Sequence, residues 1–80
     1  MEEKILKILG DLNEEALNYK GDNLYKDGVL DSIQVIDLVV QLEEDFDIDI
    51  APEMVILENF ANKDTIINLV KKILEGQNAR

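Results

Sequence analysis

Cysteine and histidine are both missing from the 80-residue chain. Without cysteine the protein has neither disulfides nor thiolate metal sites, so apolar packing must stabilise the fold. The 46% hydrophobic content is enough for one small domain over residues 1–80. A serine nucleophile would lack its histidine base, and a cysteine nucleophile does not exist. We therefore expect no catalytic residues.

Long hydrophobic runs are missing as well. The longest uninterrupted apolar stretch has only a few residues, which is too short for a membrane span. The N-terminal segment MEEKILKILG carries acids where a secretory signal would carry bases. The expected compartment is therefore the cytoplasm.

Positive charge is missing from the middle of the chain. The net charge is −10, and the segment between Lys26 and Lys63 holds ten acids and no base. The rest of the chain is neutral, with eight acids and eight bases. Nucleic acid is excluded as a partner because it requires basic patches, whereas partners with basic surfaces are favoured. A solvated acidic face without any partner is the alternative interpretation.

Helical spacing of the apolar residues predicts an all-α fold, a small bundle of three main helices and one short helix with a long first loop. The main helices are expected over 3–17, over 32–45 and from the NKDT segment at 62–65 to a C-cap at Gly76, with a frayed tail over 76–80. A short helical turn is expected near 54–58, after Pro52. Four apolar residues of the loop over 18–30 are expected to anchor it in the core: Leu24, Tyr25, Val29 and Leu30.

The second predicted helix carries two apolar stripes. At about 100° per residue, one stripe is expected to face the core. It consists of Val35, Leu38, Val39, Leu42 and Phe46. A second stripe has acidic neighbours, and burying the whole helix would place an unpaired Glu43 in the core at high cost. We therefore expect an exposed surface that suits a basic, apolar partner. This surface, called the outer patch below, consists of Ile33, Ile36, Asp37, Val40, Glu43 and Glu44.

Ser32 is the only serine of the chain, and it follows Asp31 where this helix is expected to begin. Asp31 is expected to cap the helix in a capping box with Gln34. Ser32 is either an ordinary first-turn residue or an attachment site for a phosphate-linked group. A phosphodiester there would lie against free backbone N–H groups and the positive end of the helix dipole. The residues alone leave both interpretations open.

The segment DFDID at 45–49 imitates the start of a calcium loop, with acids as its first, third and fifth residues. Ile50 stands where such a loop requires glycine, and Ile56 stands where it requires glutamate. The calcium-loop interpretation therefore fails, and no metal site is expected. Weak binding of divalent ions to the acid cluster stays an alternative.

With these motifs together, the chain resembles the acyl carrier protein family, the carriers that bear phosphopantetheine. The family's signature is a glycine shortly before Asp-Ser, an aliphatic residue after it, and a helix ending in a Leu-Glu-Glu-x-Phe-like run. Gly28, Asp31, Ser32 and Ile33 match the first part, and LEEDF at 42–46 matches the second at the correct distance. The resemblance extends over nearly the whole chain.

The resemblance implies that Ser32, beside Asp31, bears 4′-phosphopantetheine, which a phosphopantetheinyl transferase adds covalently from coenzyme A. The thiol of this arm would carry an acyl or aminoacyl thioester from a loading enzyme to a downstream synthase or transferase. The protein itself would not be an enzyme. The outer patch would dock on basic patches of these partners, and we expect the carrier to be a monomer.

Some residues depart from the fatty-acid carriers of this family. Ile33 and Gln34 stand where those carriers usually have leucine and an acid, and Glu58-Asn59-Phe60 also differs from their usual form. These departures favour D-alanyl, polyketide or peptide pathways over fatty acid biosynthesis and leave the cargo open. An unmodified acidic protein-interaction module and a divalent-ion-binding helical domain are the rival functions.

Overall fold

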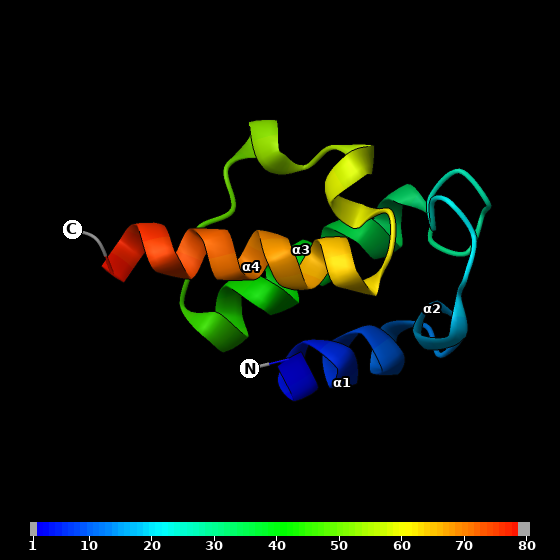
Figure 1. Ribbon diagram of the computed structural model, residues 1–80, viewed down its shortest axis with the longest axis horizontal. Helices are drawn as coiled ribbons and strands as arrows, with labels where there is room; N and C mark the ends of the chain where they lie inside the picture. The colour runs from blue at the N-terminus through cyan, green and yellow to red at the C-terminus, as the bar shows by residue number, and fades with distance from the viewer. Residues whose placement is uncertain (1, 79–80) are drawn as a thin grey trace.

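Helices make up all of the regular structure in residues 2–78, the part of the chain that the computed structural model describes. The predicted all-α bundle is confirmed, and Figure 1 shows its arrangement. Helix α1 packs against both α3 and α4, and the second of two 3-10 turns, η2, packs against α4. In chain order the elements are α1 (Glu2–Leu12), α2 (Glu15–Asn18), α3 (Ser32–Phe46), η1 (Pro52–Met54), η2 (Leu57–Phe60) and α4 (Lys63–Asn78).

The first predicted helix, over 3–17, is confirmed except for an interruption at residues 13–14, which separates α1 from α2. The side chain of Asn13 donates from Nδ2 to the Val29 carbonyl at 2.6 Å and accepts from the Glu15 N–H at 3.0 Å. An asparagine side chain that bonds the backbone N–H two residues later competes with helical hydrogen bonding. Helix α2 lies against the C-terminal end of α1, and a Cβ on Gly10 would lie 2.8 Å from Leu17 Cδ1. Glycine at position 10 thus permits the two helices to approach closely.

The loop before α3 is anchored largely as expected. Leu24 and Leu30 are buried, and Val29 packs partly buried against the core. The backbone of Leu24 donates to the Ala61 carbonyl at 2.7 Å, which ties the loop to the end of η2. Gly28 lies in the turn with φ +78°, a conformation that favours glycine. The expectation for Tyr25 is wrong, because its side chain is 38% exposed instead of anchored in the core.

A tyrosine outside the expected anchors also holds this loop. The Tyr19 hydroxyl donates to the Asp27 carboxylate and accepts from the Asn23 backbone N–H at 2.5 Å. Desolvation and the hydrogen bond to Asp27 raise the pKa of Tyr19 above its usual range. The loop that leads into α3 is therefore closed by side-chain as well as backbone hydrogen bonds.

The segment after Pro52 differs from the single helical turn predicted near 54–58. Pro52 begins η1, and Val55 and Ile56 have non-helical backbone between η1 and η2. The Asn59 side chain donates to the Met54 carbonyl at 2.7 Å, so a side chain takes the place of a continuing helical bond. Apolar side chains on this non-helical stretch stay partly exposed beside α3.

Helix α4 begins as predicted and ends later. The Asn62 side chain accepts from the Thr65 N–H at 3.0 Å, and Thr65 Oγ accepts from the Asn62 N–H at 3.2 Å. The predicted C-cap at Gly76 is wrong, because α4 continues to Asn78 and Gly76 has no positive φ. Residues 79–80 of the predicted frayed tail lie outside the described residues.

The core lies where α1, α3, α4 and the loop anchors meet. The predicted core stripe of α3 is confirmed, since Val35, Leu38 and Leu42 are buried and its other two members pack partly buried against the core. The largest fully buried side chains are Phe60, Ile5, Leu9, Leu24, Leu30, Leu38, Leu42, Ile66 and Val70. Within residues 2–78, no helix has the length and apolar character that crossing a membrane requires.

Candidate functional site

Ser32 is exposed and is the first residue of α3. The capping box predicted before it is present: Asp31 Oδ1 accepts from the Gln34 N–H at 2.8 Å, and Gln34 Oε1 accepts from the Asp31 N–H at 3.3 Å. These two bonds fix the direction in which α3 begins. They also leave the Ser32 hydroxyl on the surface, beside first-turn N–H groups that have no partner within the helix.

The capping box gives a testable effect on stability. Replacing Asp31 with alanine removes the acceptor for the Gln34 N–H and is expected to lower the free energy of unfolding by about 1 kcal/mol. Asparagine keeps an acceptor at this position, so Asp31→Asn is expected to lose much less. Urea unfolding of the three proteins measures both differences. Equal losses for alanine and asparagine would show that the cap does not act through this hydrogen bond.

A shallow groove of about 470 Å³ opens directly beside Ser32. It runs between the start of α3 and the non-helical stretch that follows η1. Apart from Ser32 and one carboxylate, its lining is apolar or aromatic. The lining of this Ser32 groove consists of Tyr25, Ser32, Val35, Ile36, Val55, Ile56, Glu58 and Phe60.

Most of the outer patch lies in solvent. Ile33 is 69% exposed, Ile36 59% and Val40 46%, values that are high for aliphatic side chains. Asp37 and Glu44 are also exposed. The apolar side chains and these two carboxylates therefore share the solvent-facing side of α3.

Glu43 differs from the rest of the outer patch. Its side chain is half-buried, and its Oε2 accepts from the Ile50 N–H at 2.9 Å. Helix α3 ends at a left-handed C-cap: Asp47 has φ 53°, and its backbone N–H donates to the Glu43 carbonyl. The expectation of a freely exposed Glu43 is thus wrong, because this side chain holds the segment that follows α3.

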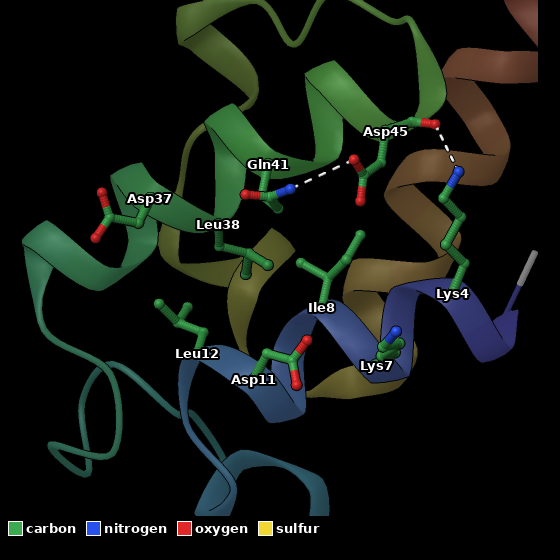
Figure 2. A pocket seen from close by; sticks show the side chains of 9 residues that line it. All are labelled: Lys4, Lys7, Ile8, Asp11, Leu12, Asp37, Leu38, Gln41 and Asp45. Carbon is green, nitrogen blue, oxygen red and sulfur yellow. Dashed lines mark hydrogen bonds between the residues drawn. The ribbon is translucent and has the colours of Figure 1, made fainter.

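A second pocket, of about 450 Å³, lies between α1 and α3 (Figure 2). Lys4 donates from Nζ to the Asp45 carbonyl at 2.9 Å and lies 5.2 Å from the centre of the Phe46 ring. Gln41 donates to the Asp45 side chain at 3.3 Å. Figure 2 shows Asp37 at the opposite end of this pocket from Lys4. The pocket therefore mixes cations and carboxylates, unlike the Ser32 groove on the other side of α3.

In the described part of the chain the acids of residues 27–62 form no ion pair within 4.0 Å, although Asp37 and Asp45 share a pocket with Lys4 and Lys7. The ion pair found within residues 2–78 joins Lys71 to Glu2 at 3.2 Å and involves none of these acids. In the same described part of the chain, no group of three or more acidic side chains is placed to hold a metal ion. Repulsion among the acids is therefore relieved mainly by solvent and salt.

This repulsion predicts that salt stabilises the protein. Raising NaCl from about 0.05 M to about 0.5 M, or adding millimolar Mg²⁺, should increase the free energy of unfolding by on the order of 1 kcal/mol. The increase follows because screening weakens repulsion between like charges that the fold brings together. Thermal melts at several salt concentrations measure it. A melting temperature that changes with neither salt nor Mg²⁺ would contradict the expectation.

The sequence pattern does not predict the Ser32 groove. Val55 and Ile56 stand in a short apolar run after Pro52, and the sequence pattern predicts Tyr25 in the core although it is exposed. The sequence does indicate that this run lacks helical amphipathic spacing, so no face of it is predicted to enter the core.

Comparison with known proteins identifies the family. Residues 3–73 match the family described as "Phosphopantetheine attachment site". The chain is 35% identical over 77 residues to the D-alanyl carrier protein of Streptococcus uberis, an alignment that covers 95% of this chain and 89% of the relative. It is 34% identical over 74 residues to the D-alanyl carrier protein of Streptococcus mutans, covering 91% of this chain and 85% of the relative. This chain therefore belongs to the acyl carrier protein family, whose members hold 4′-phosphopantetheine covalently, act as carriers and are not themselves enzymes.

Proposed function

We propose that this protein carries an aminoacyl group, bound as a thioester to 4′-phosphopantetheine on Ser32. The observation that carries the proposal is the place of Ser32: it is the only serine, it is exposed, and it begins a capped helix inside the family match. In the modification, the Ser32 oxygen forms a bond to the phosphorus next to the pantetheine part of coenzyme A. The bond between that phosphorus and the bridging oxygen breaks, the nucleotide leaves, and the serine proton is lost to solvent through the transferase.

Local electrostatics support the proposal. By helix geometry, the N–H groups of Ser32 and Ile33 have no carbonyl partner within α3, whereas Asp31 already satisfies the N–H of Gln34. A phosphodiester on Ser32 would lie near these two groups and the positive end of the helix dipole. When the arm is bound, its thiol supplies the thioester chemistry. The chain's own residues fix the attachment point and the docking face.

The partners of the carrier would be a phosphopantetheinyl transferase, a loading enzyme and a downstream synthase or transferase. Exposed apolar side chains of the outer patch, with Asp37 and Glu44 beside them, suit a partner surface that is apolar and basic. Glu43 contributes to this face through its charge and through the segment that it holds. The proposal includes the expected monomeric, cytoplasmic state of the protein.

For the cargo, we propose D-alanine. Both relatives reported above are D-alanyl carrier proteins, and they align with nearly the whole chain. Ile33 and Gln34 after the serine also depart from the usual form of fatty-acid carriers. Polyketide and peptidyl intermediates are the other cargos that these departures favour.

The proposal is tested by identifying the group that the protein carries when it is purified from its native host. Intact mass of the purified protein is expected to show phosphopantetheine with and without one alanyl group, and hydroxylamine is expected to release the alanyl group because it cleaves thioesters. Chiral chromatography of the released amino acid should give the D form. A fatty acyl or polyketide group in its place would overturn the cargo. Protein that is never modified would support the rival interaction module.

A further inference from the structure

The Ser32 groove has one charged side chain among apolar walls. Glu58 lies on η2, is exposed, and lines the groove together with Ile36 and Ile56. No Lys or Arg occurs in the sequence from residue 27 to residue 62, so neither α3 nor the η1–η2 segment brings a cation to it. The groove thus offers a single negative charge to whatever occupies it.

Few charged groups on neighbouring elements compete for this carboxylate. Lys72 of α4 and Glu58 both line a third pocket, between the η1–η2 segment and α4. In the described part of the chain these two residues do not form an ion pair within 4.0 Å. Tyr25 is the other titratable group of the groove lining. Asp31, which precedes Ser32, adds negative charge to this end of α3 and is held by its bond to Gln34.

An arm attached to Ser32 starts inside this groove, because Ser32 is part of its lining. An aminoacyl thioester ends in an α-ammonium, whereas a simple acyl thioester ends in an uncharged chain. A carboxylate beside apolar walls discriminates between these ends, since an opposite charge close by favours the ammonium form.

We propose that Glu58 is a specificity-determining residue that binds the α-ammonium of the aminoacyl group when the loaded arm folds back into the Ser32 groove. The inference rests on the proposed function, because it requires an arm on Ser32. Apolar contacts with Ile36 and Ile56 hold the pantetheine part, and Glu58 selects a cargo with a positive charge. The groove is open to solvent, so the interaction resembles an exposed ion pair in strength.

The experiment attaches two arms to the full-length protein. A transferase transfers them from coenzyme A analogues in which a hydrolysis-resistant amide replaces the thioester: one ends in ¹³C,¹⁵N-labelled alanine and the other in a butyryl group. Intact mass checks attachment first. Failure to attach either arm would count against the proposed function, whereas the inference about Glu58 is decided only on protein that carries the arm.

The readout is the pKa of the alanyl ammonium, followed by NMR through the labelled atoms. In the wild type it is expected to be higher than in Glu58→Gln by roughly 0.2 to 0.7 units, the range that an exposed ion pair supplies. The control is Glu53→Gln, which removes an exposed charge of the same segment outside the groove lining. In this variant the ammonium pKa should stay close to that of the wild type and above that of Glu58→Gln.

A second measurement distinguishes a local contact with Glu58 from the electrostatic field of the whole acidic segment. The alanyl arm should shift the methyl signals of Ile36 and Ile56 in the wild type more than in Glu58→Gln, whereas the butyryl arm should shift them equally in both proteins. Equal ammonium pKa values in the wild type and Glu58→Gln would overturn the inference. Equal effects of Glu58→Gln and Glu53→Gln would also overturn it, because the field of the acidic segment would then suffice.

Discussion

Replacing Leu42 with alanine is expected to lower the free energy of unfolding by about 2–5 kcal/mol. Leu42 belongs to the core stripe of α3 and is 0% exposed. The substitution removes buried methyl groups and leaves a cavity that the surrounding helices fill only in part. A small domain has a total stability of roughly 5–15 kcal/mol, so this single change removes a large share of it.

The matched control is Val40→Ala on the exposed side of the same helix. Val40 is 46% exposed and belongs to the outer patch, so its truncation is expected to change stability by about 0.5 kcal/mol or less. Urea unfolding monitored by circular dichroism compares the two variants. Similar losses for both would mean that the two stripes of α3 are assigned to the wrong faces.

Reversing the charge of Asp37 to lysine is expected to slow modification by a phosphopantetheinyl transferase about threefold to tenfold at low salt. Asp37 is exposed on the outer patch, and a basic partner is steered toward such a carboxylate before contact. The stability of the folded protein should change by no more than about 0.5 kcal/mol, as is usual for a surface charge. The difference in rate should shrink as salt increases, because screening removes the steering.

Glu14→Lys provides a control with the same change in charge. Glu14 is exposed and lies outside the acidic segment, between α1 and α2. Transferase rates and thermal melts of the wild type and the two variants separate a local effect from one of net charge. Equal rates for Asp37→Lys and Glu14→Lys would place recognition elsewhere on the surface. Unfolding of Asp37→Lys would show that Asp37 has a structural role.

Structural features formed by residues close together in the chain can be predicted from the sequence. The capping box at Asp31 and Gln34 and the core stripe of α3 both depend on fixed spacings within one helix, and both are present. The Asn62–Thr65 cap is local in the same way. Caps and core stripes occur at fixed spacings within one helix, so the order of residues in the sequence predicts them.

The differences that shape the candidate site arise where a side chain contacts residues outside its own helix. At the break after α1, Asn13 bonds the Val29 carbonyl, sixteen residues away, and spacing within the helix does not indicate this contact. Glu43 is half-buried because its side chain accepts a hydrogen bond from the backbone of Ile50, in the segment after α3. The Ser32 groove forms only when the stretch around Val55 and Ile56 lies beside α3. Tertiary contacts of this kind override local propensity, and they decide the shape of the candidate site.

The most direct test of the central claim is to find which residue bears the arm. Apo protein and its Ser32→Ala variant are incubated with coenzyme A and a broad-specificity transferase, and intact mass and fragment spectra are recorded. The wild type is predicted to gain one phosphopantetheine, which the fragments assign to Ser32, and the variant is predicted to gain none while keeping its helical circular dichroism. No gain by the wild type with a transferase shown to be active, or an equal gain by Ser32→Ala, would contradict the account.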